Sequence, residues 1–168
     1  FLLRVTTEVV LNGQKQRLMI HGGAGFGDIE RGVKSTSWLA PSTYQPPQAI
    51  YETAAETKAV RVLAQNIGTK TVQEAPMRYG GVDDQYFLAA IVTGGKNTRL
   101  EYAPLTVKTP QGDRILVDYR VRVAGDAPFT FFLGPKEFDL LQRVDAELPR
   151  VIHFGMFGFL ATPLLKAL

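Results

Sequence analysis

The sequence predicts a mainly β protein, with antiparallel strands in the body of the chain and helices at its C-terminal end. Short apolar or β-branched runs alternate with turn signals, and the 168 residues include 16 glycines and 10 prolines. This pattern is typical of short strands joined by many turns. A helical spacing of apolar residues begins only near residue 135. Because strand and helix patterns do not alternate along the chain, a parallel βαβ sheet is not expected.

The amino-acid composition limits the kinds of functional site and partner that this chain is expected to have. Hydrophobic residues make up 45% of the chain and charged residues 21%, as in ordinary globular proteins. No apolar run in the sequence approaches the ~18 residues that span a bilayer. The absence of cysteine excludes disulfides, iron–sulfur clusters and thiolate zinc sites. Two histidines and a net charge of +3 favour neither a histidine metal site nor a nucleic acid partner. We therefore expect no metal, no cofactor and no nucleic acid.

The first strands are predicted to form a hairpin. Residues 4–11 and 15–20 are apolar or β-branched runs, and Asn12-Gly13 between them favours a tight turn because both residues tolerate positive φ. The glycine-rich stretch 21–27 is predicted as a loop. Residues 35–48, rich in Ser, Thr and Pro, are predicted as a second and longer loop.

Further strands are predicted in the middle of the chain. Residues 49–53 and 59–66 are the weaker candidates. Residues 85–92 contain the run YFLAAIV, which is continuously apolar, as in a strand that is buried on both faces. Another strand is predicted over residues 99–107.

The clearest alternation lies in residues 114–123, after a turn at residues 109–113. A period of two with one apolar face is typical of a strand that packs on one side and meets water on the other. The inward face is predicted to hold Ile115, Val117, Tyr119, Val121 and Val123, and the solvent face Asp118, Arg120 and Arg122. A last strand is predicted over residues 129–133.

After this strand the apolar period changes to that of a helix. Gly134-Pro135 is predicted to open the helix, because proline fits the first turn, and the helix is predicted over residues 136–148 with Pro149 as its end. Four apolar positions share one stripe of it and are predicted to pack against the sheet. They are Leu140, Leu141, Val144 and Leu148.

The candidate polar sites each have a simpler structural interpretation. The glycines of residues 22–27 lack the spacing of a dinucleotide-binding or phosphate-binding loop. His21 and His153 are far apart in sequence, so ordinary hydrogen-bonded histidines are favoured over an epimerase-type active site. Asp83-Asp84 favours a cap at a strand end over a cation site or an acid–base pair. The arginines of residues 114–122 favour a solvated strand face, because no aromatic platform accompanies them.

The C-terminal segment is the one unusual stretch, because residues 151–168 are far more apolar than the rest of the chain. On a helical wheel, a narrow polar stripe holds Gly155, Thr162 and Lys166. One interpretation is a helix packed on the core, and the other is a helix that lies in a membrane interface with Lys166 reaching the headgroups. The candidate membrane-interface residues are Phe154, Met156, Phe157, Phe159, Leu160, Leu164, Leu165, Lys166 and Leu168.

Three stretches resemble the YidC family of bacterial membrane protein insertases. Residues 132–136 (FLGPK) and 153–166 (HFGMFGFLATPLLK) are similar to that family's G-P-K helix and to its segment that runs toward the membrane core. Residues 81–91 (GVDDQYFLAAI) are similar to a strand of its large first periplasmic domain. The resemblance is sharp over residues 79–92 and 131–168.

The resemblance implies a fold and a location. The implied fold is an antiparallel β-supersandwich, similar in outline to galactose-mutarotase-like domains, with C-terminal α-helices. The implied domains are a β-sandwich over residues 1–134, a helical linker packed on it over 135–150, and an amphipathic membrane-interface helix over 151–168. That last helix would lead toward a transmembrane core outside this chain. The implied location is the periplasmic side of the bacterial inner membrane.

The resemblance also implies a role in docking and positioning, with no enzyme activity and no cofactor. The implied partners are SecD–SecF and the Sec translocon, nascent membrane proteins through the parent protein, and the membrane surface through the C-terminal helix. The fold analogy leaves one alternative function, a carbohydrate-binding sandwich. Its groove would need aromatic side chains such as those of Trp38, Tyr44, Tyr79 or Tyr102.

Overall fold

A computed structural model describes residues 1–24, 45–68, 71–110, 112–124 and 128–152 of the chain. The chain divides into two compact units, Phe1–Pro135 and Lys136–Leu168. Among the described residues, the first unit holds the strands and the second holds one α-helix and one 3-10 helix.

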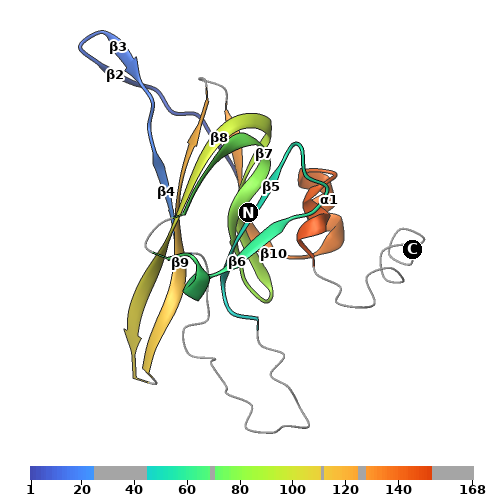
Figure 1. The fold of residues 1–168 in the computed structure, drawn as a ribbon. Coiled ribbons are helices and arrows are strands. Elements are labelled where there is room, and N and C mark those ends of the chain that lie inside the picture. The colour runs from blue at the N-terminus through green and yellow to red at the C-terminus, as the bar shows by residue number, and fades with distance from the viewer. Residues whose placement is uncertain (25–44, 69–70, 111, 125–127, 153–168) are drawn as a thin grey trace, which may run out of the picture. The chain divides into compact units, whose positions relative to one another are not determined.

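The first unit is built of strands (Figure 1). In chain order they are β1 (Leu2–Val5), β2 (Val9–Leu11), β3 (Gln14–Gln16), β4 (Ile20–Gly23), β5 (Gln48–Thr53), β6 (Val60–Leu63), β7 (Thr71–Asp83), β8 (Phe87–Thr109), β9 (Gly112–Val123) and β10 (Phe129–Pro135). A 3-10 helix, η1 (Ala64–Asn66), follows β6.

The strands form one large antiparallel sheet and one small hairpin. The large sheet has eight strands, six of them in the order β1-β10-β8-β7-β5-β6, while β9 pairs with β8 and β4 pairs with β9. The hairpin β2–β3 pairs with neither edge of this sheet. The predicted antiparallel β class is therefore confirmed.

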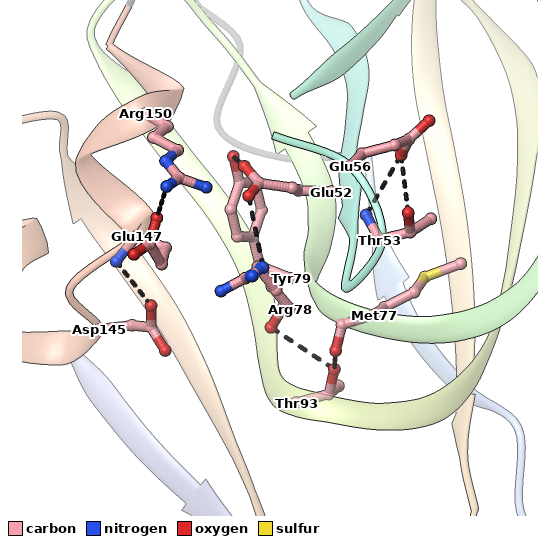
Figure 2. Close-up of polar contacts among 10 residues, drawn as sticks. All are labelled: Glu52, Thr53, Glu56, Met77, Arg78, Tyr79, Thr93, Asp145, Glu147 and Arg150. Atoms are coloured by element: carbon pink, nitrogen blue, oxygen red, sulfur yellow. Dashed lines mark hydrogen bonds and ion pairs between the residues drawn. The ribbon is translucent and has the colours of Figure 1, made fainter. Parts of the chain in front are cut away.

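The two longest strands bend, so that the sheet folds back on itself. The first part of β8 lies between β10 and β7, and its second part lies between β7 and β9. At the bend, Gly94 and Gly95 take φ values of +60° and +83°, which glycine adopts without steric cost. On β7 the register shifts around Arg78, and the hydroxyl of Thr93 donates to the carbonyl oxygen of Met77 at 2.5 Å (Figure 2). Kinks and bulges of this kind let strands pass from one layer of a sandwich to the other.

A row of aromatic rings fills the space between the two parts of the sheet. Ring centroids lie 6.5 Å apart for Tyr51 and Tyr102, 6.4 Å for Tyr102 and Tyr119, and 6.3 Å for Tyr119 and Phe131. The hydroxyl of Tyr102 donates to the carbonyl oxygen of Ile50 at 2.7 Å. The same hydroxyl accepts the backbone N–H of Gly81 at 3.1 Å. Tyr102 thus joins the second part of β8 to strands β5 and β7 through the core.

Alkaline solution is expected to destabilise this core. Burial raises the pKa of Tyr102 well above the usual value of 10.0, and burial also raises the pKa of Tyr119. The unfolded chain releases these protons near pH 10 while the folded chain retains them. The contribution of the buried phenols to stability is therefore present below about pH 10 and is lost as the pH rises further. For each tyrosine that stays protonated in the folded chain, the free energy of unfolding falls by up to about 1.4 kcal/mol per pH unit above about pH 10.

Urea unfolding of the Tyr119→Phe variant at pH 9, 10 and 11 tests this expectation. The hydroxyl of Tyr119 is buried and has no hydrogen-bond partner among the described residues, so the variant should fold. Its stability should fall less steeply with pH than that of the parent chain. Equal slopes for the two proteins would contradict the expectation.

The predicted N-terminal hairpin is only partly right. Asn12 and Gly13 make the expected tight turn, with φ values of +53° and +76°, and β2 pairs with β3 around it. Each predicted strand is broken, however, because β1 pairs with β10 and β4 pairs with β9. The hairpin that remains projects away from the sheet, and all of its strand residues are exposed (Figure 1). Residues 21–23, predicted as a loop, belong to β4.

Strand β7 was not predicted from the sequence. Pro76 and the pair Gly80-Gly81 interrupt its pattern, and such residues ordinarily weaken a strand. In the structure, β8 lies so close to both glycines that a side chain at either position would clash with it. A Cβ on Gly80 would lie 2.1 Å from the side chain of Leu100, so the glycine makes room for a core leucine. The predicted strands 85–92 and 99–107 are parts of the single strand β8, because the glycines between them bend the strand without ending it.

The predicted alternation of β9 is confirmed only in part, because Asp118, on the predicted solvent face, is only 14% exposed and the neighbouring Leu116 is buried. Val117, Tyr119 and Val121 are fully buried, and Arg120 is exposed. Ile115, predicted to face inward, is 48% exposed. Its pairing partner on β8 is Thr106, whereas β7 begins to pair with β8 only at Tyr102. Ile115 therefore lies on the part of the β8–β9 hairpin that extends beyond β7.

Over residues 136–152, the described part of the second unit, the chain is less helical than predicted. It contains α1 (Phe138–Val144) and the 3-10 helix η2 (Leu148–Val151). Gly134 and Pro135 belong to β10 and do not open the helix; Pro135 pairs with Phe87 at the end of the ladder, where a missing N–H is tolerated. Extended backbone at Asp145 ends α1 before Pro149 is reached, and Pro149 lies in the first turn of η2.

Candidate functional site

The predicted apolar stripe falls on α1 and η2. Leu141 and Leu148 are fully buried, and Leu140 and Val144 are half-buried. The N–H of Asp145 donates to Leu141 at 3.1 Å, and the N–H of Leu148 donates to Asp145 at 3.1 Å. These bonds connect the two helical turns. Burial at the four positions agrees with an apolar stripe, and its packing against the sheet stays a prediction.

Charged side chains hold the connection between α1 and η2. The Asp145 carboxylate accepts the backbone N–H of Glu147 at 2.8 Å, and the Glu147 carboxylate pairs with Arg150 one turn later (Figure 2). Residues 153–168 lie outside the described residues. The predicted membrane-interface residues and His153 belong to that segment, so their assignments stay predictions. No helix within the described ranges is both long and apolar enough to cross a bilayer.

His21 is hydrogen-bonded, as the sequence favoured. Its Nε2 lies 2.5 Å from a carboxylate oxygen of Asp118, which joins β4 to β9. The His21 side chain is 58% exposed, so the pair lies on the surface of the sheet. This surface pair adds to the backbone pairing of β4 with β9 and gives no indication of an enclosed catalytic cleft.

Asp83 and Asp84 have different roles. Asp83 is fully buried, and its Oδ2 accepts from Gln45 at 3.0 Å and from Gln48 at 3.3 Å. Arg61 on β6 lies 3.5 Å from the same oxygen. Asp84 accepts the backbone N–H of Gln85, as predicted for a cap. The neighbouring carboxylates therefore do not act as an acid–base pair, because Asp83 ties β5, β6 and β7 together while Asp84 shapes the following turn.

A second buried carboxylate lies at the β7 bulge (Figure 2). Glu52 on β5 is fully buried, and the hydroxyl of Tyr79 donates to its Oε2 at 2.9 Å. The Nε of Arg78 lies 3.6 Å from its Oε1. Arg78 is the residue at which the pairing of β7 shifts with both β5 and β8. The glutamate therefore fixes the bulge that bends β7.

The arginine face of β9 is a face of mixed charge. Across it on β8, Arg99 bonds Glu101 at 2.9 Å and Glu74 at 3.1 Å. Arg120 lies directly opposite Glu101 in the register. Because acidic and basic side chains alternate on this face, it resembles the solvated strand face that the sequence favoured and lacks the uniform charge of a polyanion-binding surface.

The carbohydrate-binding alternative loses two of its four proposed aromatic residues. Tyr79 is fully buried and bonds Glu52, and Tyr102 is 1% exposed and bonds the backbone in the core. Neither ring can stack on a sugar at the surface. Trp38 and Tyr44 lie outside the described residues. In the described part of the chain, His, Asp and Glu side chains form no cluster of three or more that would suit a metal ion.

Sequence reasoning missed three charged groups that shape the fold, a fully buried glutamate and two partly buried arginines. The sequence predicts no structural role for Glu52, Arg61 or Arg78, because a charged residue in a short strand ordinarily faces solvent. The one available signal was the conflict between Glu52 and the apolar run AIY before it. A buried glutamate in such a strand requires a partner, and the partner comes from a strand that the sequence did not predict.

Comparisons with known proteins agree on one family. Residues 2–167 match the family model described as YidC periplasmic domain. A protein of Magnetococcus marinus named membrane protein insertase YidC is 31% identical over 153 residues, which are 81% of this chain and 25% of that protein. Proteins of the same name in Geobacter sulfurreducens and Endomicrobium trichonymphae are 31% identical over 114 residues and 27% identical over 148 residues. These matches cover 60% and 82% of this chain, and 19% and 25% of the two relatives. The chain thus spans a quarter or less of the length of these relatives.

Proposed function

Since the chain belongs to the family of YidC periplasmic domains, we propose that it serves a membrane protein insertase as a docking and positioning domain. The family match over residues 2–167 is the observation that carries this proposal. Insertion itself would take place in other parts of the longer protein. The location that fits this role is the periplasmic side of the bacterial inner membrane.

A binding role, without catalysis, fits the chemistry of the described residues. The two fully buried carboxylates each face a cation and uncharged donors: Glu52 meets Arg78 and Tyr79, and Asp83 meets Arg61 and two glutamines. Buried charges that are paired in this way hold strands together and are not poised for proton transfer. The paired buried charges thus help to hold the strands in a fixed arrangement, and the surface of that arrangement can bind partners.

Two contacts would perform the positioning. The apolar segment 151–168 would lie on the membrane surface, with its apolar side chains in the interface and Lys166 at the headgroups. The surface of the sandwich would dock on SecD–SecF and the Sec translocon. Nascent membrane proteins would meet the parent protein and not this domain in particular.

Flotation with two kinds of vesicle separates the membrane contact from the docking contact. The chain is mixed with liposomes of bacterial lipid composition, or with the same liposomes carrying SecD–SecF, and is centrifuged through a density gradient. We expect it to float with both. The double variant Leu164→Glu and Leu165→Glu should lose flotation with the plain liposomes, because two charges would enter the apolar interface. It should keep flotation with the SecD–SecF vesicles.

A matched control carries the same two charges on the sandwich. Leu105 and Ile115 are 43% and 48% exposed, so Leu105→Glu with Ile115→Glu should leave flotation on plain liposomes unchanged. If the Leu164/Leu165 variant floated as well as the parent chain, the membrane contact would be wrong. If SecD–SecF vesicles retained none of that variant, the docking contact would be wrong.

A further inference from the structure

The turn between β7 and β8 carries an exposed aromatic side chain at its tip. Tyr86 is 64% exposed, and Phe87, the first residue of β8, is 43% exposed. The backbone N–H of Asp84 donates to the carbonyl oxygen of Phe87 at 3.0 Å and closes the turn. The side-chain amide of Gln85 donates to the Tyr86 hydroxyl at 3.1 Å. These contacts all lie within residues 84–87, so the turn defines its own shape and the position of the tyrosine.

The same turn exposes little negative charge. Asp84 is 9% exposed, and its carboxylate accepts the backbone N–H of Gln85. Asp83, at the end of β7, is fully buried beside Arg61. An exposed carboxylate would be repelled by an anionic surface. A tyrosine combines an apolar ring with a polar hydroxyl and is enriched where hydrocarbon meets water. The chemistry of the turn therefore suits the headgroup region of a bilayer.

The first unit ends beside this turn. Pro135, its last residue, pairs with Phe87 in the ladder between β10 and β8. Between Pro135 and residue 151 the chain includes α1 and η2. Helical residues rise by about 1.5 to 2.0 Å and extended residues by at most about 3.4 Å, so this stretch of chain spans at most about 35 Å. The apolar segment 151–168 therefore begins within a short length of chain from the turn.

We propose that the β7–β8 turn places Tyr86 in the headgroup region of the same bilayer on which the segment 151–168 is proposed to lie. The inference rests on that proposed function, because the membrane contact of the segment holds the end of β10 near the bilayer. The tyrosine ring would lie among the headgroups with its hydroxyl toward water. One aromatic side chain binds a bilayer weakly, so the turn adds to the contact of the segment and does not replace it.

This second contact would give the positioning role a physical basis. A body attached to a surface by one segment of chain is free to tilt about that attachment. Two contacts on different parts of the chain, Tyr86 and the segment 151–168, would restrict the tilt. The sandwich would then keep one end toward the bilayer and present the rest of its surface to partners in the periplasm.

Tryptophan fluorescence tests the contact of the turn directly. The chain has one tryptophan, Trp38, so Trp38→Phe supplies a background without tryptophan emission. In this background the emission of Tyr86→Trp should shift to shorter wavelength when vesicles of phosphatidylethanolamine and phosphatidylglycerol are added. Vesicles with brominated lipids should quench that emission at least about twofold, since the ring would lie at the bilayer surface.

Leu11→Trp in the same background is the matched control. Leu11 is 61% exposed and belongs to β2. Strand β2 follows β1, whose Val5 pairs with Phe129 at the other end of β10 from Pro135. The Leu11→Trp emission should neither shift nor be quenched when the vesicles are added.

Vesicle partition measures how much the turn contributes, in a chain that keeps Trp38. Tyr86→Asp replaces the ring by a charge and should weaken partition onto these vesicles at least about threefold. Leu11→Asp should leave partition unchanged. Circular dichroism verifies that each variant folds as the parent chain does.

The outcomes separate this inference from the function on which it rests. If the parent chain fails to bind the vesicles, the membrane contact of segment 151–168 is wrong and this inference is overturned with it. If the parent chain binds while the Tyr86→Trp emission is unchanged, or while Tyr86→Asp partitions as the parent does, only the contact of the turn is wrong. An emission shift of Tyr86→Trp that grows with protein concentration without vesicles would assign the turn to a protein contact and would equally overturn the inference.

Discussion

Gly81→Ala is expected to destabilise the protein by about 4 kcal/mol or more, which places it among the most damaging single substitutions. A Cβ at this position would lie 2.0 Å from the carbonyl oxygen of Ala89 and 2.6 Å from the Cα of Ala90. Both atoms belong to the backbone of the neighbouring strand, so no side-chain movement relieves the clash. The N–H of Gly81 also donates to the hydroxyl of Tyr102, and a displaced β7 would break that bond.

Thermal unfolding measures the effect, with Gly134→Ala as the matched control. A Cβ on Gly134 would come no closer than 3.2 Å to the described structure, at the end of the Phe132 ring. We expect its cost to be about 1 kcal/mol or less, since a ring edge can give way by a few tenths of an ångström. The Gly81 variant should melt at least about 10 °C below the parent chain. Melting temperatures that agree within a few degrees for the two variants would contradict the expected clash.

Glu52→Ala is expected to cost about 3 kcal/mol, the second largest effect. The substitution removes the fully buried carboxylate and takes from Tyr79 and Arg78 the partner that they share. Arg78 is partly solvent-exposed, with 34% of its side chain accessible, so water recovers some of the loss. Because Arg78 is the bulge residue of β7, the loss should also loosen the bend of that strand.

Chemical denaturation together with amide hydrogen exchange measures both consequences. Glu56→Ala is the control, because Glu56 lies at the exposed end of the same region and bonds only to Thr53 among the described residues (Figure 2). It should cost about 0.5 kcal/mol. Amides around Met77 and Thr93 should exchange faster in Glu52→Ala than in Glu56→Ala. A stability for Glu52→Ala within 1 kcal/mol of that control would show that the buried carboxylate does not hold the bulge.

Local patterns were sufficient where one strand meets solvent on one face. The alternation over Val117–Val121 predicted the buried and exposed sides of β9, and Asn12-Gly13 predicted a tight turn. Both are properties of a few neighbouring residues. The resemblance carried by residues 81–91 and 131–168 indicated the family, because these stretches combine uncommon residues in a fixed order.

Local patterns failed where the reason for a residue lies in another strand. The pair Gly80-Gly81 predicts an interruption of a strand. In the structure the strand continues, and Leu100 and the backbone of β8 occupy the space that side chains would need. Gly94-Gly95 reads as the end of a strand, yet the ladder with β7 continues on both sides of it. Pro135 predicts the start of a helix, but it pairs with Phe87 and belongs to β10.

By itself, the sequence determined the antiparallel β class, the turn at Asn12-Gly13 and membership in the YidC family, since these depend on spacing and on residue order along the chain. Only the tertiary structure decided which strands pair, where β7 and β8 bend, and which carboxylates are buried. These features depend on contacts between residues that are far apart in sequence. A residue's own neighbours do not report whether a distant strand supplies its hydrogen bonds or fills its space.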